Sequence, residues 1–263
     1  MFLSEEEKSL EMKKSKRRIV DNCDKCKGSG FVTKTNSNGD SMSFVCSCIK
    51  KAERNVRLLD GGFPRKFLDD EKWCLELVEG RPYYKPVKDY IDNFLYNYDN
   101  GIGLFLHGAQ GRGKSTIECI IAKAVVDMIN PDTFEKKEHF KVAFSMYDDI
   151  LHGLIDNDKK EKYNQLIYRS DLLIIDNIGN EFGRNERGFS QRTLEIILRK
   201  RDNDCLPTIL STNYCLNEME EQYNKDIRQF IEQNYEVVYL SGNNYRIKKE
   251  ENHNKETDVD IQF

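Results

Sequence analysis

The pattern of apolar and polar positions predicts buried strands that alternate with helices. Five short apolar runs read as strands, at residues 102–106, 141–147, 172–176, 208–212 and 236–242. Helical periodicity lies between them, clearest in "STIECIIAKAVVDMI" and "QRTLEIILRKRD". This alternation favours an α/β fold with a five-stranded parallel sheet wrapped by helices, and ligands of such sheets bind at the carboxyl ends of the strands.

The segments on either side follow other patterns, so we expect four parts. Residues 1–58 hold a basic helix and a cysteine-rich module, residues 59–80 a linker, residues 81–248 the α/β core and residues 249–263 an acidic, disordered tail. With 263 residues, of which 38% are hydrophobic, the chain can bury one substantial core and carry a small additional module.

Charge is unevenly distributed along the chain. Residues 1–66 contain 15 Lys and Arg against 9 Asp and Glu, a balance of +6, whereas the whole chain carries −4, which leaves −10 for the remainder. The basic end is therefore the candidate contact with nucleic acid or an acidic partner. Its densest run equally fits the solvated face of a helix, and consists of Lys13, Lys14, Lys16, Arg17 and Arg18.

The location of the protein is predicted from the absence of long apolar segments. No run approaches the roughly 18 apolar residues of a membrane span, and acids stand near the N-terminus where a secretory signal is apolar. We therefore expect a cytoplasmic protein with reduced cysteines and no membrane partner.

Four of the eight cysteines form two pairs, Cys23 with Cys26 and Cys46 with Cys48, separated by 19 residues. Tetrahedral Zn²⁺ needs four thiolates that converge from two short turns, and glycines after the first pair let the chain fold back. The residues between the pairs read as a β-hairpin around "NSNGD". We predict a zinc site at these four cysteines, with free structural cysteines or a redox pair as the alternatives.

A glycine-rich loop, "GAQGRGKST", follows the first strand of the core and opens a helix, as the P-loop pattern requires. Backbone N–H groups and the helix N-terminus suit phosphate groups in such a loop. The Lys114 ammonium is expected to neutralise the β- and γ-phosphate oxygens, and the Ser115 hydroxyl to ligate Mg²⁺. The residues expected to bind ATP are Gly108, Gly111, Gly113, Lys114, Ser115 and Thr116.

Two further strand ends carry polar residues that suit phosphate chemistry. The apolar run 172–175 ends at Asp176, a Walker B acid that would hold Mg²⁺ together with Ser115. The next residue, Asn177, stands where many such ATPases carry an acid that polarises the attacking water, and an amide cannot take a proton. Asn213 follows strand 208–212 and is placed to hydrogen-bond a γ-phosphate or its water.

These motifs together resemble a known family. The segments "LFLHGAQGRGKST", "DLLIIDNIG", "PTILSTN" and "YLSGNNYR" are similar to the AAA+ ATPases of the DnaC/DnaI helicase-loader type and to their relatives, the IstB-like transposition ATPases. The resemblance covers about residues 60–248, including "GGFPRKF". The arrangement of a cysteine-rich N-terminal module before such a core is similar to that of the helicase loaders encoded by phages and Gram-positive bacteria.

The resemblance implies a protein that uses ATP, binds the hexameric replicative helicase through its N-terminal module and helps deliver it to single-stranded DNA. It also implies assembly into a homo-oligomeric spiral through the ATPase faces, and no helical lid, because little chain follows Arg246. Family members carry an acid at the position of Asn177 and, before the last strand, an arginine that reaches the neighbouring subunit. Phe230 stands at that arginine's position, so either Arg228 substitutes for it or activation between subunits is weak.

Other functions fit parts of this sequence. An IstB-like transposition ATPase shares the core motifs, whereas a P-loop kinase of a small metabolite lacks support because no arginine-rich lid or acceptor-activating base is visible. A nucleotide-regulated adaptor or inhibitor with little turnover suits Asn177 and Phe230. Glu181 could compensate for the missing base but reads rather as a solvated loop acid. We therefore expect an ATPase with slow intrinsic hydrolysis, in which ATP acts mainly as a switch.

Overall fold

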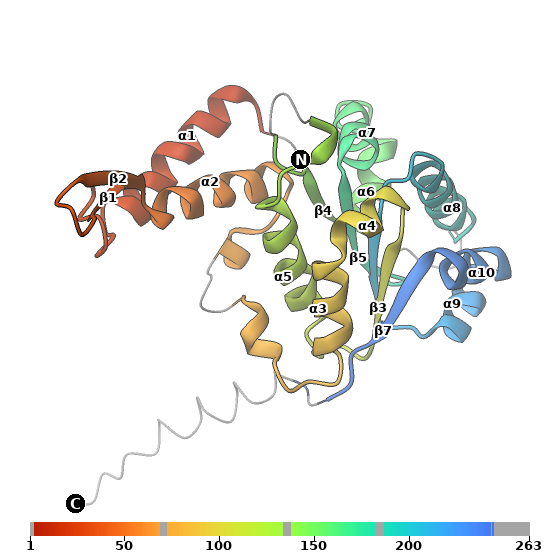
Figure 1. Cartoon of the computed structure of the whole chain (residues 1–263). Coiled ribbons are helices and arrows are strands. Elements are labelled where there is room, and N and C mark those ends of the chain that lie inside the picture. The colour runs from red at the N-terminus through yellow and green to blue at the C-terminus, as the bar shows by residue number, and fades with distance from the viewer. Residues whose placement is uncertain (1–2, 69–72, 134–137, 182–186, 243, 245–263) are drawn as a thin grey trace, which may run out of the picture.

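The fold consists of an α/β core and an N-terminal module that projects from it (Figure 1). The structure, a computed structural model, describes residues 3–68, 73–133, 138–181, 187–242 and 244. The expected tail at 249–263 and Arg246, on which the expectation of a missing lid rests, lie outside these residues.

Five parallel strands form the sheet of the core, as the sequence predicts. They are β3 (Gly103–His107), β4 (Val142–Met146), β5 (Leu172–Ile178), β6 (Thr208–Thr212) and β7 (Tyr235–Tyr239). Their order across the sheet is β4-β5-β6-β3-β7. Because β6 lies between β3 and β5, the carboxyl ends of these three strands are adjacent, which brings the P-loop, Asp176 and Asn213 to one edge of the sheet.

Helices cover both faces of this sheet, which explains why strands β3 to β6 are buried at most of their positions. One face packs against α3 (Tyr84–Asp92), α4 (Phe94–Asp99) and α5 (Lys114–Val126). The other face packs against α6 (Tyr147–Ile155), α7 (Lys160–Arg169), α8 (Arg187–Asn203), α9 (Leu216–Gln222) and α10 (Lys225–Asn234). Alternate strand residues belong to the two cores: Leu104 and Ile174 face the first, and Phe105 and Ile175 face the second.

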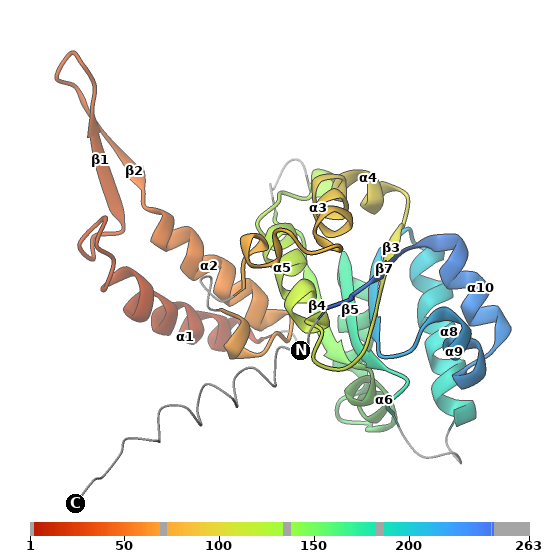
Figure 2. The same ribbon diagram turned by 90° about the horizontal axis from the view of Figure 1, so that it is seen from below.

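The N-terminal module contains two helices and a hairpin. Helix α1 (Glu5–Ser15) starts with a capping box at Ser4, continues into a π-helical turn (Lys16–Val20), and lies beside α2 (Ser47–Asp60). Between these helices the chain forms the predicted hairpin, in which β1 (Phe31–Thr35) pairs antiparallel with β2 (Ser41–Val45). Figure 2 shows the hairpin extending away from the rest of the molecule.

Helix α2 fastens this module to the core. Arg54 and Arg57 both form ion pairs with Asp127, which follows α5, at 3.1 and 2.9 Å. The N–H of Phe144 on edge strand β4 donates to the carbonyl of Gly61 at 2.7 Å. The contact between module and core is therefore made by backbone and side chains together.

The segment expected as a linker is packed rather than extended where the structure describes it. It includes two short 3₁₀ helices, Arg65–Leu68 and Leu75–Val78. Phe63, Phe67 and Val78 are buried in the same hydrophobic cluster as strand β3 and helix α5. These apolar residues cover the face of α5, so the segment contributes to the core of the ATPase-like domain.

Candidate nucleotide and metal sites

The P-loop connects β3 to α5 in a conformation that depends on glycine. Gly108, Gly111 and Gly113 have φ values of 149°, 81° and 94°, a region that L side chains rarely adopt. At Gly108 a Cβ atom would also lie 2.6 Å from the carbonyl oxygen of Leu240. Gly113 is the N-cap residue of α5, and Thr116 lies in the first turn of that helix. The loop therefore presents its backbone at the positive end of a helix dipole.

Lys114 joins the P-loop to the end of strand β6. Its ammonium donates to the carbonyl oxygens of Gly108 at 2.6 Å and Ala109 at 3.3 Å, and to Oδ1 of Asn213 at 2.7 Å. The predicted lysine and the predicted amide thus meet at one point, where both can reach the same phosphate group.

Asp176 lies between two hydroxyl groups. The Ser115 hydroxyl donates to Oδ2 at 3.0 Å, and the Ser211 hydroxyl donates to Oδ1 at 2.5 Å. A hydroxyl and a carboxylate at hydrogen-bond distance, directly behind a P-loop lysine, form the kind of oxygen donor set that Mg²⁺ binds next to a nucleotide's phosphates. Ser211 was not identified from the sequence, because only the pairing of β6 beside β5 places it there.

Asn177 occupies a β-bulge. The register between β5 and β6 shifts between Ile175 and Ile178, and Asn177 has φ of 65°, in the left-handed region that asparagine tolerates better than most residues. Its side-chain oxygen accepts a hydrogen bond from Nδ2 of Asn180 at 2.7 Å. The bulge turns the strand end so that Asp176 stays beside Ser115 while Asn177 follows at the half-buried rim of the site.

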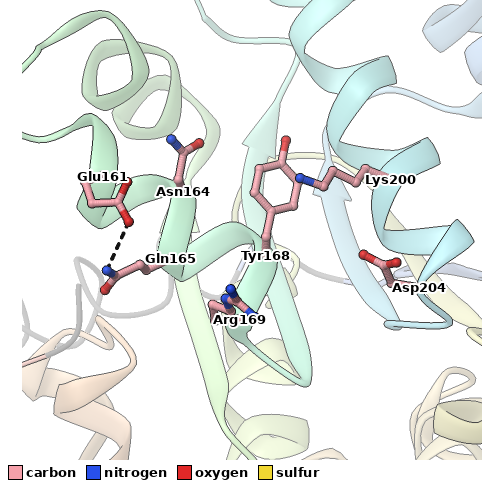
Figure 3. A pocket seen from close by; sticks show the side chains of 7 residues that line it. All are labelled: Glu161, Asn164, Gln165, Tyr168, Arg169, Lys200 and Asp204. Atoms are coloured by element: carbon pink, nitrogen blue, oxygen red, sulfur yellow. Dashed lines mark hydrogen bonds between the residues drawn. The ribbon is translucent and has the colours of Figure 1, made fainter.

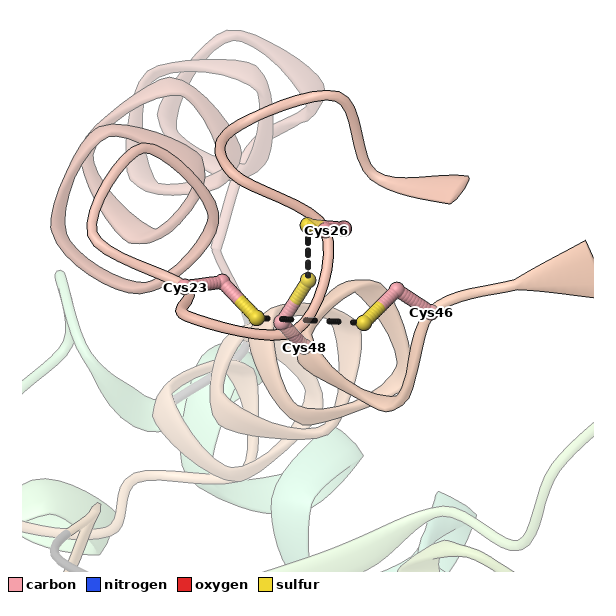
Figure 4. A group of neighbouring side chains, drawn as sticks. All are labelled: Cys23, Cys26, Cys46 and Cys48. Carbon is pink, nitrogen blue, oxygen red and sulfur yellow. Dashed lines mark hydrogen bonds between the residues drawn. The ribbon is translucent and has the colours of Figure 1, made fainter. Parts of the chain in front are cut away.

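The four predicted zinc ligands converge, as Figure 4 shows. Their sulfur atoms all lie within 4.8 Å of one another, with Cys23 to Cys46 at 3.8 Å and Cys26 to Cys48 at 3.5 Å. Four sulfurs around a tetrahedral zinc ion at about 2.3 Å are separated from one another by about 3.8 Å. The cluster therefore has the donor set and the spacing to hold a zinc ion.

The environments of these thiols differ. Hydrogen bonding from the backbone of Cys26 is the main cause that lowers the pKa of Cys23 to about 7, which favours its thiolate. Burial is the main cause that raises the pKa of Cys48. The other four cysteines, Cys74, Cys119, Cys205 and Cys215, form no such cluster among the described residues.

Comparison with known proteins finds relatives by structure. No protein-family model matches the chain, and no curated protein matches it significantly. A crystal structure of the DnaC helicase loader is 20% identical, with a TM-score of 0.53 over 68% of this chain and 100% of its own. One of DnaI is 18% identical, with a TM-score of 0.53 over 69% of this chain and 93% of its own. AMPPCP-bound DnaA from Aquifex aeolicus is 18% identical, with a TM-score of 0.50 over 73% of this chain and 58% of its own.

These similarities extend over 68–73% of this chain and establish its architecture. The chain has the AAA+ fold. The chain spans little more than half the length of two of its structural matches: 58% of the DnaA chain and 57% of the chain of a DNA replication initiation factor. The DnaC and DnaI structures are instead covered almost completely.

Glu181 is not the solvated loop acid that the sequence suggests. It is half-buried, and its carboxylate accepts hydrogen bonds from the N–H of Gly179 at 2.6 Å, from the Ser190 hydroxyl at 2.6 Å and from the Tyr223 hydroxyl. These donors belong to the loop after β5, to α8 and to the residue after α9. Glu181 therefore ties the loop that follows Asp176 to two helices, because its partners come from segments far apart in the sequence.

Arg228 and Phe230 lie on α10. Arg228 forms ion pairs with Glu220 at 2.7 Å and Glu232 at 3.1 Å, both within the same chain. Phe230 packs against the Tyr235 ring, and the Arg199 guanidinium lies 5.8 Å from the centre of the Phe230 ring. Both ion pairs would have to break before the Arg228 guanidinium could contact another molecule.

Glu118 is a second residue near the P-loop, besides Ser211, that the sequence analysis did not identify. It lies one turn after Lys114 on α5 and is fully buried, and burial, together with the negative charge of Asp176, raises its pKa well above the usual value. The sequence does contain a feature that could have identified it: a glutamate inside the apolar run "TIECII", which is unusual in a buried helix.

A cavity lies near the amino ends of strands β5 and β6, on the opposite edge of the sheet from the P-loop. The cavity, of about 460 Å³, is lined by Glu161, Asn164, Gln165, Tyr168, Arg169, Lys200 and Asp204 (Figure 3). These residues belong to α7 and to the end of α8, which lead into the starts of β5 and β6, so the cavity is remote from the P-loop. The Lys200 ammonium lies 3.8 Å from the centre of the Tyr168 ring.

Among the described residues, no helix is long and apolar enough to cross a membrane.

Proposed function

We propose that this chain is an ATP-dependent helicase loader of DNA replication. It binds a hexameric replicative helicase through its N-terminal module and helps place that helicase on single-stranded DNA in the cytoplasm. The observation that carries the proposal is the combination of an AAA+ core, shared in fold with DnaC and DnaI, and a cysteine-clustered module fastened beside it. Assembly of several copies through the ATPase faces belongs to the same proposal.

ATP and Mg²⁺ bind at the P-loop in this proposal. Backbone N–H groups of the loop and Lys114 hold the β- and γ-phosphates, while Ser115 and Asp176 hold the metal. Mg²⁺, when bound, neutralises negative charge on the phosphates. Asn213 contacts the γ-phosphate in this proposal, because its side chain already accepts a hydrogen bond from the Lys114 ammonium, which binds the same phosphate. Zn²⁺ is held by Cys23, Cys26, Cys46 and Cys48.

ATP acts mainly as a switch in this proposal, because Asn177 cannot serve as a base. We expect Asn177→Asp to raise ATP turnover about tenfold or more, since general-base assistance typically contributes about 10² to 10⁴ and the shorter aspartate recovers part of it. Asp also tolerates the left-handed backbone at this position, which Glu tolerates less well. Steady-state phosphate release measures the effect.

The matched control is Asn203→Asp, which makes the same change on an exposed side chain at the end of α8, away from the P-loop. Equal turnover of the wild type and Asn177→Asp, at a rate normal for AAA+ enzymes, would contradict the switch.

A second candidate function, a nucleotide-regulated adaptor or inhibitor, is favoured by the ion pairs that hold Arg228 within its own chain. An IstB-like transposition ATPase remains the nearest alternative on the core motifs.

The hairpin is the surface through which the module is proposed to bind the helicase. Its exposed side chains include Phe31, Met42, Phe44 and Val45, each 45–60% accessible. Pairing of Val32 with Phe44 and of Lys34 with Met42 places apolar groups and one ammonium on one face. Aromatic residues and methionine that are exposed together on a projecting element are typical of protein interfaces.

We expect the double variant Met42→Ser/Phe44→Ser to weaken helicase binding about 100-fold, because two exposed apolar anchors on the same face of the hairpin each contribute about 1–3 kcal/mol. Both side chains are exposed, so the variant should fold and bind nucleotide like the wild type. Co-purification with the replicative helicase of the same source measures the loss. Tyr96→Ser is the control, since Tyr96 is an exposed aromatic residue on α4 of the core. Undiminished binding by the hairpin variant would assign the contact elsewhere.

A further inference from the structure

Glu181 fastens the loop after β5 to two helices, and the proposed function gives this acid no role. Its carboxylate accepts hydrogen bonds from the N–H of Gly179, from the Ser190 hydroxyl and from the Tyr223 hydroxyl. Ser190, in the first turn of α8, is also held from α6, because its carbonyl accepts from the Tyr147 hydroxyl. Hydrogen bonds to a carboxylate are about twice as strong as neutral ones, so Glu181 fixes the relative positions of these segments.

The same loop contacts the end of strand β6. The Thr212 hydroxyl donates to the carbonyl of Ile178 at 2.7 Å and accepts from the N–H of Tyr214 at 3.2 Å. The Tyr214 ring packs against Gly179, where a Cβ atom would lie 2.6 Å from two ring atoms. A movement of Tyr214 therefore acts directly on the glycine whose N–H Glu181 holds.

The P-loop lysine reaches the residue before Tyr214. An ammonium has three N–H donors, and that of Lys114 donates to Gly108, Ala109 and Asn213. A phosphate group that binds Lys114 must displace one or more of these acceptors. Asn213 is the acceptor that lies outside the P-loop, so a change in its contact with Lys114 acts on the end of β6 and on Tyr214.

The far end of these contacts is the junction of α9 and α10. Tyr223 lies between Gln222, the last residue of α9, and Asn224, the N-cap residue of α10. The ion pair between Arg228 and Glu220 also joins the two helices, at 2.7 Å. A shift of Tyr223 therefore changes how α9 and α10 are held on the core.

We propose that Glu181 is a positioning residue that couples nucleotide binding at the P-loop to the order of α9 and α10. Phosphate at Lys114 changes the contact with Asn213, Tyr214 carries the change to the loop after β5, and Glu181 carries it to Tyr223. Nucleotide orders the two helices because it favours the arrangement in which all these contacts are made. The inference rests on the nucleotide binding proposed above.

The test follows hydrogen exchange of residues 216–234 in the full chain with Mg²⁺, with and without saturating AMPPCP. Glu181→Ala removes the acceptor, Tyr223→Phe removes only the hydroxyl at the far end, and the double variant removes both. Glu221→Ala is the matched control, since it removes an exposed acid from α9 itself. Calorimetry gives the AMPPCP affinity of each chain, and a thermal melt shows that each is folded.

We expect AMPPCP to slow exchange in α9 and α10 about fivefold or more in the wild type and in Glu221→Ala, the lower end of typical coupling between two sites. Glu181→Ala and Tyr223→Phe should bind AMPPCP with wild-type affinity and lose this response. The double variant should behave like either single one, because both residues belong to one connection. General loosening of the fold would speed exchange with and without nucleotide alike and would leave the response in place.

A wild-type response in either folded single variant would overturn the proposal, and Tyr223→Phe, which keeps the ring, decides if Glu181→Ala does not fold. The proposal is equally wrong if the wild type binds AMPPCP and exchange in α9 and α10 does not change. A wild-type chain that binds no AMPPCP would refute the proposed function itself.

Discussion

Replacing Cys23 with serine is expected to abolish zinc binding and unfold the hairpin module. The cluster of buried residues in this module is small, and three of its five members are cysteines: Val20, Cys26, Cys46, Cys48 and Ala52. Without a metal, little apolar contact would hold the two cysteine turns together, whereas binding of a structural zinc ion contributes about 10–16 kcal/mol in small domains. Elemental analysis should find about one zinc per wild-type chain and none in the variant.

Loss of structure should be confined to the module. Hydrogen exchange of residues 23–46 should become fast in Cys23→Ser, while AMPPCP binding stays at the wild-type level, because α2 is held on the core by Arg54, Arg57 and Gly61. Cys205→Ser is the matched control, since Cys205 is exposed and remote from the cluster in sequence. A zinc-free wild-type protein with a protected hairpin would contradict the metal assignment.

Replacing Lys114 with alanine is expected to weaken ATP binding about 100-fold or more. A P-loop lysine makes charge-assisted hydrogen bonds to phosphate oxygens, each of about 1.5–3 kcal/mol, so the loss of two corresponds to at least two orders of magnitude. Calorimetric titration with AMPPCP and Mg²⁺ measures the change. Helicase binding through the hairpin should persist in the absence of nucleotide.

Two controls distinguish the loss of phosphate contacts in Lys114→Ala from unfolding of the P-loop. Lys114 also holds the P-loop through Gly108 and Ala109, so a thermal melt must show that the variant is folded. Lys225→Ala removes an exposed lysine at the start of α10 and should leave affinity unchanged. Near-wild-type affinity in Lys114→Ala would mean that nucleotide does not bind at this loop.

Local patterns account for most of what could be predicted from the sequence. The P-loop pattern falls within nine residues, and the five strands are short apolar runs, so both are recognisable without knowledge of the fold. The hairpin between the cysteine pairs was likewise predicted from its turn and its alternating residues. The fold comparison confirms the AAA+ assignment at the level of architecture.

Features that depend on strand order could not be predicted. Ser211 reaches Asp176 only because β6 lies beside β5, and Glu181 meets Tyr223, 42 residues away, only after α8 and α9 have packed. The bulge at Asn177 depends on pairing with a neighbouring strand. These contacts join segments far apart in the chain, and no local pattern encodes them.

The central claim is that this chain loads a replicative helicase, and one measurement tests it most directly. The replicative helicase of the same source is incubated with circular single-stranded DNA, which offers no free end for threading, and the DNA-bound helicase is counted after adding the chain with Mg²⁺ and ATP. We expect the wild type to raise the bound fraction several-fold, and the Met42→Ser/Phe44→Ser variant to leave it at the level of helicase alone. A wild-type chain that leaves the bound fraction unchanged or lowers it would contradict the loader assignment, and a fall would favour the inhibitor instead.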